Sequence, residues 1–168
     1  ADYTYTGNSN HSSNTTIKAE GCISCHMADA NVGGGIGGGH TMNIEYLNTS
    51  GAPVYLLTGC TTSGCHTAAG FTIDYISGSA VLTGGIGTQT ATHAYMDTLH
   101  TLLTDRGWIT ASGSINASTG SPLKIVPASR AGALFNYFFV EHDLSNGSHN
   151  TRYAIELLKS SIAELRKP

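Results

Sequence analysis

The stretch 21-GCISCHMADA-30 contains a complete C-x-x-C-H motif, 22-CISCH-26. Two thiols at this spacing can add across the two vinyl groups of one haem, and the adjacent histidine then reaches the iron, which is the signature of c-type haem attachment. A thioredoxin-like pair would follow a strand, and no strand pattern precedes Cys22. A zinc ribbon would need a second C-x-x-C, which is absent. The motif therefore predicts a fold organised around a haem held by Cys22 and Cys25, with His26 on the iron.

The other two cysteines lie in 57-LTGCTTSGCHTA-68, where Cys60 and Cys65 are separated by four residues and followed by His66. By itself, this stretch fits a disulfide, a pair of zinc ligands or a haem site with a longer loop. The first motif favours haem, because a chain that already receives one haem, and whose other cysteines also end in Cys-His, most simply has two sites. Thr61–Gly64 would then bulge outward, and no cysteine would remain for a disulfide.

The composition fits a chain that needs a large apolar group to complete its core. With 168 residues the chain is long enough for one ordinary domain, but only 11% of residues are charged and 21 are glycine, which favours turns over long helices. The formal net charge of −3 and the scattered Lys and Arg exclude a nucleic-acid-binding surface. No apolar run approaches the length of a transmembrane segment. No signal peptide is visible, so we expect the sequence to be the mature form.

The sequence pattern changes at about residue 91. Residues 1–20 are polar and predict an extended or irregular arm, residues 41–49 predict a short strand or extended segment, and residues 71–87 look irregular or weakly β. Apolar residues at helical spacing then predict three helices, over 91–108, 128–142 and 150–167.

The third predicted helix has Asn150 or Thr151 as its cap. Its apolar stripe consists of Ile155, Leu158, Ile162 and Leu165. The expected fold is a single domain over 1–168 that is mainly α, with much irregular structure and little β-sheet. Its parts are a polar arm (1–20), haem-attachment loops (21–90) and a helical part (91–168).

Three stretches are distinctive when taken together: 22-CISCHM-27, 38-GGHTM-42 after a glycine-rich turn, and 134-LFNYFFVEHDLSNGSHNTRYAIELLKSSI-162. In these stretches the chain resembles the multihaem c-type cytochromes of metal-reducing and related bacteria. The third is similar to that family's closing segment, which has an aromatic helix, an acidic Asp-x-Ser-x-Gly turn and a His-Asn that opens a final helix. Many members carry four or more haems, whereas this chain has cysteines for two.

The resemblance implies that each iron is bound by two histidines. The second, distal histidine often comes from a remote segment and in some members from a neighbouring subunit. His149 matches the family's His-Asn position and His40 matches its Gly-Gly-His-Thr element, so these two are the expected distal ligands. His11, on the polar arm, is the reserve.

The expected function is electron transfer by two closely spaced, covalently attached haems c. Irons with both axial positions filled relay single electrons and leave no position for a substrate, so the chain is not expected to be an enzyme. The polar arm, the low charge and the surplus of histidines favour a subunit of a homopolymeric extracellular filament. We expect an exported protein, extracellular or at the cell surface and alternatively periplasmic. Its expected partners are other redox proteins or extracellular electron acceptors.

Three other functions remain open from the sequence. The first is a soluble periplasmic electron shuttle with the same two haems. The second is a haem redox enzyme in which one iron lacks its distal histidine and is open to substrate. The third is a binding module stapled by zinc or by disulfides, without any haem.

Overall fold

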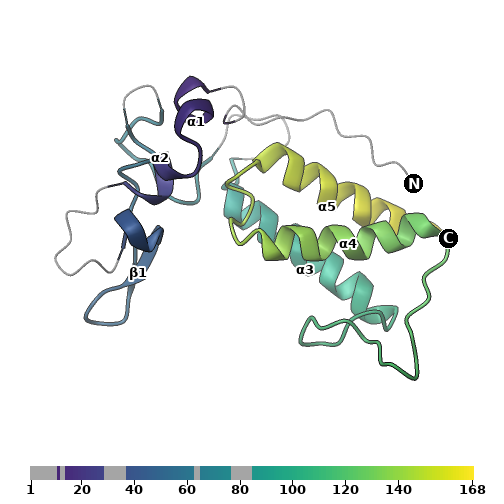
Figure 1. The fold of residues 1–168 in the computed structure, drawn as a ribbon. Coiled ribbons are helices and arrows are strands. Elements are labelled where there is room, and N and C mark those ends of the chain that lie inside the picture. Colours follow the sequence, from purple (N-terminus) through teal and green to yellow (C-terminus); the bar gives the residue numbers. More distant parts are fainter. Residues whose placement is uncertain (1–10, 12–13, 29–36, 63–64, 77–84) are drawn as a thin grey trace. The chain divides into compact units, whose positions relative to one another are not determined.

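The computed structural model describes residues 11, 14–28, 37–62, 65–76 and 85–168, and the statements below concern these residues. In them the chain forms five α-helices and one two-stranded sheet, which confirms a mainly α fold with little β-sheet. The chain divides into two compact units (Figure 1). The cysteine unit, Asn10–Tyr75, contains all four cysteines, and the helical unit, Ala1–Ser9 with Ile76–Pro168, contains the three long helices. That the whole chain is one domain stays a prediction.

The helical unit is built from α3 (Thr88–Asp105), α4 (Ala128–His142) and α5 (Thr151–Leu165), which pack side by side (Figure 1). All three helices were predicted, and α4 has the predicted bounds. Helix α3 begins and ends slightly earlier than predicted, and the chain leaves it through Gly107 at a φ of 69°. In α5 the Asn150 side chain accepts a hydrogen bond from the Tyr153 amide, as expected of the cap. No described helix has the length and apolar character needed to cross a bilayer.

The core of the helical unit consists of apolar side chains that recur at helical spacing. The predicted stripe of α5 is buried, and it packs with Leu99 and Leu103 of α3. A buried polar pair is also present, in which Asn136 Nδ2 of α4 donates to Ser161 Oγ of α5 over 2.9 Å. Because buried polar groups are costly without a partner, this hydrogen bond fixes how α4 and α5 align.

Replacement of the fully buried Leu158 by alanine is expected to destabilise the helical unit by about 2–5 kcal/mol, because the cavity is enclosed by three helices. The control is Phe135→Ala, on α4, whose side chain is 68% exposed and whose loss should change the free energy of unfolding by less than about 0.5 kcal/mol. Thermal unfolding of both purified variants provides the comparison. Equal melting temperatures would contradict the assignment of the core.

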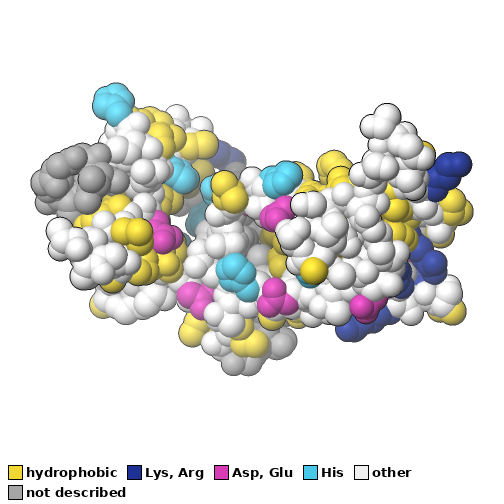
Figure 2. Space-filling view, turned by 90° about the horizontal axis from the view of Figure 1, so that it is seen from below, with side chains coloured by type: hydrophobic (Ala, Val, Ile, Leu, Met, Phe, Trp, Pro, Cys, Tyr) yellow, Lys and Arg dark blue, Asp and Glu magenta, His cyan; other side chains and the backbone are white. Residues whose placement is uncertain are grey.

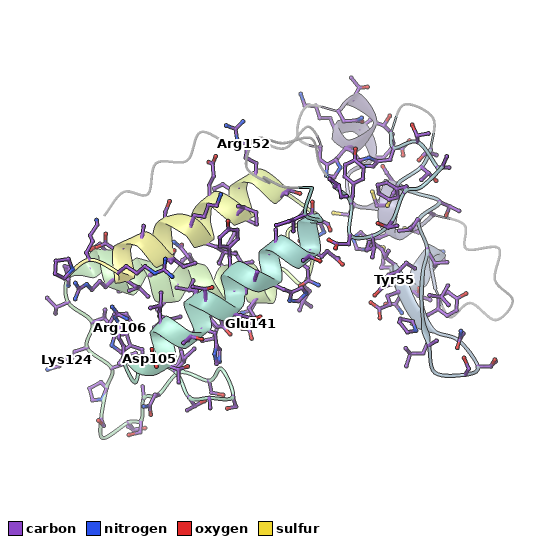
Figure 3. All side chains as sticks on the ribbon, turned by 180° about the vertical axis from the view of Figure 1, so that it is seen from behind. Tyr55, Asp105, Arg106, Lys124, Glu141 and Arg152 are labelled. Carbon is purple, nitrogen blue, oxygen red and sulfur yellow. The ribbon has the colours of Figure 1, made fainter. Side chains whose placement is uncertain are left out.

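Two arginines close the C-terminal end of α5. The Arg106 guanidinium, at the end of α3 (Figure 3), donates to the carbonyl of Leu165. Arg130 of α4 donates to the carbonyls of Lys167 and Pro168, over 3.1 and 2.9 Å. The last carbonyls of a helix have no partner within it, so the bond from Arg106 satisfies one of them and ties α5 to the end of α3. The bonds from Arg130 tie the residues that follow α5 to α4. Lys and Arg side chains gather toward this end of the helical unit (Figure 2).

The cysteine unit contains only short elements: α1 (Thr15–Glu20), α2 (Ile23–His26), the 3₁₀ turn η2 (Gly39–Thr41) and the strands β1 (Glu45–Leu47) and β2 (Pro53–Tyr55). The strands pair antiparallel, with Tyr46 opposite Val54. The Asn48 side chain closes the hairpin by accepting from the amides of Ser50 and Ala52. The predicted short strand is thus confirmed at β1.

The expectation of an irregular arm was wrong at its C-terminal end, where α1 forms. Asn14 caps this helix, because its side chain accepts from the amides of Thr16 and Ile17 over 2.9 and 3.1 Å. Gly21 ends the helix at a φ of 63°, a conformation that favours glycine. Helix α1 therefore leads directly into the first cysteine motif. Residues 1–10, 12 and 13 of the predicted arm lie outside the described residues.

Candidate functional site

The first cysteine motif is a single helical turn. The His26 amide donates to the Cys22 carbonyl over 3.0 Å, and the Met27 amide donates to the Ile23 carbonyl over the same distance. Residues three and four apart in a helix lie on one side of it. Cys22, Cys25 and His26 therefore share one side of this turn, as the attachment of one haem to both thiols and to the imidazole requires.

The ring of His26 is oriented by a backbone carbonyl. Its Nδ1 lies 2.9 Å from the Met42 oxygen, and a carbonyl oxygen can only accept, so Nδ1 carries a proton and the neutral imidazole would bind a metal through Nε2. A hydrogen bond of this kind commonly supports a metal-binding imidazole. Met42 follows η2 and has a φ of 59°. Sequence reasoning missed this acceptor, because every residue has a backbone carbonyl and none has a sequence signal for it.

The second motif closes with the same backbone hydrogen bond as the first. The His66 amide donates to the Cys60 carbonyl over 3.0 Å, just as the His26 amide donates to the Cys22 carbonyl. The second motif is two residues longer, so this bond is not the ordinary bond of a helical turn. The first cysteine and the histidine nevertheless keep the same backbone connection in both motifs.

Threonine hydroxyls hold the start of the longer loop. Thr61 Oγ1 donates to the Leu57 carbonyl over 3.1 Å, and Thr62 Oγ1 donates to the Gly59 carbonyl over 2.7 Å. These bonds fold the chain back on itself directly around Cys60. The outward bulge predicted for Thr61–Gly64 falls partly on Ser63 and Gly64, which lie outside the described residues.

The two motifs are in direct contact. A Cβ atom on Gly59 would lie 2.6 Å from the Ser24 oxygen and 2.9 Å from the Cys25 Cα, so the two backbones touch there. The Cys60 side chain hydrogen-bonds to that of Cys25, and this bond, together with burial, raises the pKa of Cys60 above its ordinary value. One cysteine of each motif thus adjoins a cysteine of the other.

Gly59→Ala is expected to destabilise the cysteine unit by about 1–3 kcal/mol, because the added methyl group meets rigid backbone atoms rather than a flexible side chain. Gly120→Ala serves as the control, since a Cβ there meets nothing within 4 Å. Thermal unfolding followed by circular dichroism measures both variants. If Gly59→Ala melts at the same temperature as the control, the backbones are not in contact.

His66 lies among three other rings. It stacks on Phe71 with ring centroids 4.4 Å apart, lies 4.5 Å from the ring of Tyr75, and meets His11 edge to face at 6.0 Å with an interplanar angle of 86°. Burial lowers the pKa of His66 and the nearby His11 lowers it further, which favours the neutral imidazole that binds metals. With metal–nitrogen bonds of about 2 Å, two imidazoles on opposite sides of one metal have centroids on the order of 6 Å apart. The separation of His11 and His66 matches that distance, and the edge-to-face rings would have to turn for a nitrogen of each to reach one metal.

The two predicted distal ligands lie in different units. His40 is in η2 of the cysteine unit and is exposed, two residues before the carbonyl that orients His26. His149 is in the helical unit, with its Nδ1 2.8 Å from Asp143 Oδ1 and its side chain 56% exposed. Burial acts to raise the pKa of Asp143, but hydrogen bonds from Ser145 and His149 hold it below its usual value. His149 therefore has the carboxylate partner that is typical of metal-binding histidines.

The loop that carries His149 is packed firmly on α3. Leu144 and Asn146 have φ values of 55° and 49°. Gly147 has a φ of 85° and is buried. A side chain on Gly147 would collide with Thr92 of α3. The sequence predicted His149 as a ligand through the His-Asn resemblance, which stays a prediction, and the structure adds Asp143 as the residue that orients its ring.

Large apolar side chains stay exposed beside the first motif and around His66. Ile23, inside the motif, is 50% exposed, while Met42 and Tyr75 are 40% and 39% exposed. A haem is a large, mostly apolar disc, and a haem attached at these cysteines would cover such side chains, so the residues present fit that group. Within the described ranges, no three His, Cys, Asp or Glu side chains are grouped to hold a metal ion by themselves.

Comparisons with protein-family models, with curated proteins and with solved structures found no match to this chain.

Proposed function

We propose that the chain is a covalent haem protein with two attachment sites, one at Cys22 and Cys25 and the other at Cys60 and Cys65. The observation that carries the proposal is the backbone hydrogen bond from histidine to first cysteine, which has the same length in both motifs. A haem gives a reason for motifs of different length to share this bond, because both sulfurs and the imidazole must reach fixed positions on one rigid ring.

More specifically, we propose a dihaem c-type cytochrome that transfers electrons. The bound haems supply one-electron redox chemistry at iron. His26 and His66 are the proximal ligands, and the Met42 carbonyl keeps Nε2 of His26 as the ligating nitrogen. We propose His11 as the distal ligand of the haem at Cys60 and Cys65, in preference to His149 and His40, which the sequence favoured. The ring separation and the shared unit of His11 and His66 support this assignment.

For the haem at Cys22 and Cys25 we propose His40 as the distal ligand, because it lies in the same unit as those cysteines. His149 is also a proposed haem ligand, because the hydrogen bond from its Nδ1 to Asp143 fixes the tautomer in which Nε2 binds metal. With two histidines at each iron, the chain's role would be to hold the haems, shield them and set their spacing. The contact between Cys25 and Cys60 supports a short distance between the haems, which a relay requires.

The test is to produce the chain in a host that attaches haem c and to count the haems. We expect a strong Soret band, two haems per chain by pyridine haemochrome analysis, and a mass increased by two haems after denaturation. A chain without Soret absorption would contradict the proposal and would favour a binding module held together by zinc or by disulfides. Carbon monoxide should bind the reduced protein only weakly. Strong binding would instead favour a redox enzyme with one open iron.

We also propose that the protein is exported and assembles with copies of itself. Phe135 and Phe139 form an exposed aromatic pair on α4, with ring centroids 6.3 Å apart, and Leu144 beyond the end of α4 is 83% exposed. A net charge of −3 opposes association of identical chains only weakly. A contact that repeats head to tail without closing gives a filament. Negative-stain microscopy checks this: dispersed particles at every salt concentration and pH would leave a soluble periplasmic shuttle.

A further inference from the structure

The cysteine unit places thiols of different motifs closer together than attachment to separate haems requires. Cys25 belongs to the first motif and Cys60 to the second, yet their side chains hydrogen-bond to each other. At Gly59, next to Cys60, the backbone is in van der Waals contact with Ser24 and Cys25. All four cysteines are thiols in this structure.

We propose that, before haem attachment, Cys25 and Cys60 form a disulfide that links the two motifs. This inference rests on the proposed attachment of haem at both motifs. A disulfide needs Cβ atoms about 3.5–4.5 Å apart, and two thiols in hydrogen-bond contact on touching backbones need little movement to reach that geometry. Within the first motif, Cys22 and Cys25 are one helical turn apart, so a disulfide between these two cysteines is the competing outcome.

The oxidant is a low-molecular-weight disulfide such as oxidised glutathione, of the kind available in an oxidising compartment. The thiolate of one cysteine attacks the glutathione disulfide, which releases one glutathione thiol and forms a mixed disulfide. The second cysteine, as its thiolate, then attacks the protein sulfur and releases the second glutathione. Two thiols of the protein thus lose two protons and two electrons, and one glutathione disulfide becomes two thiols.

This disulfide would act on both haem sites at once. It leaves Cys22 in the first motif and Cys65 in the second, so each motif keeps only one thiol for the two vinyl groups of its haem. Neither haem could be attached through both thioethers until a reductant opens the bond. A single thiol–disulfide exchange would therefore make both motifs ready together.

The experiment uses the full chain, produced without haem attachment, reduced, freed of reductant and then exposed to oxidised glutathione. Free thiols are alkylated, and the digested protein is mapped by mass spectrometry without reduction. We expect a cross-linked peptide pair containing Cys25 and Cys60, with alkylated Cys22 and Cys65. Cys22→Ser should keep this pair and Cys25→Ser should lose it. Disulfides within the motifs, or four alkylated cysteines, would overturn the inference.

The haem count of the same chain from an attaching host separates this inference from the proposed function. Two haems together with disulfides confined to each motif would overturn the inference and leave the cytochrome intact. The Cys25–Cys60 pair in a chain that never acquires a Soret band would overturn the cytochrome proposal. In that case the disulfide could not control haem attachment, and it would only link the two motifs.

Discussion

A chain in which Cys60 and Cys65 are both replaced by serine is expected to carry one covalently attached haem instead of two. Serine hydroxyls do not form the thioethers that hold haem c, so the haem content per chain and the mass added by haem should both fall by half. The Soret band should remain, because the first motif is complete in itself: its helical turn and the bond from His26 to Met42 involve neither cysteine. Pyridine haemochrome analysis and the intact mass of the denatured protein measure the loss.

The matched variant replaces Cys22 and Cys25 by serine and should also keep one haem. Its remaining haem would depend on the longer motif alone, which makes this variant the stricter test of that motif. Two haems in the variant lacking Cys60 and Cys65 would contradict the second site. No haem in the variant lacking Cys22 and Cys25 would show that the longer motif does not function without the first.

His11→Ala is expected to open one of the two irons. In the unaltered protein His11 and His66 would fill both axial positions of the second haem, and removal of His11 leaves its iron five-coordinate. The reduced variant should then bind carbon monoxide at about one haem of two, whereas the unaltered protein should bind almost none. The ferric variant should show a high-spin signal in electron paramagnetic resonance.

His93→Ala, an exposed histidine of α3, is the control and should leave both measurements unchanged. If His40→Ala rather than His11→Ala opens the second haem, the assignment of His11 is wrong.

The helices were predictable to the extent that their signals are local. Helix α4 has its predicted bounds because a proline precedes it and apolar residues recur along it, and the buried stripe of α5 could be read from spacing alone. Helix α1 was missed because it is six residues long and has no buried residue, so it has no apolar period. Its signal was the single cap Asn14, which looks the same in a polar loop.

The site was predictable where its residues adjoin in sequence. The two cysteine motifs and their histidines follow from spacing, and His149 and His40 from resemblance. The proximity of His11 to His66, and of Cys25 to Cys60, depends on how the chain folds between them and has no local signal. Backbone acceptors such as the Met42 carbonyl also have no sequence signal, although this one orients the ring of His26.

If the proposed second haem is attached, the bond from the His66 amide to the Cys60 carbonyl has a consequence for the way haems are counted in genomes. A search for C-x-x-C-H assigns one haem to this chain and would class it as a carrier of a single electron. If haem attachment requires only that this hydrogen bond closes the loop from the first cysteine to the histidine, the number of residues in the loop can vary. A better criterion for a haem site would then be a Cys-His pair with another cysteine a short loop before it. Cytochrome inventories that rely on fixed spacing would underestimate how many chains can conduct.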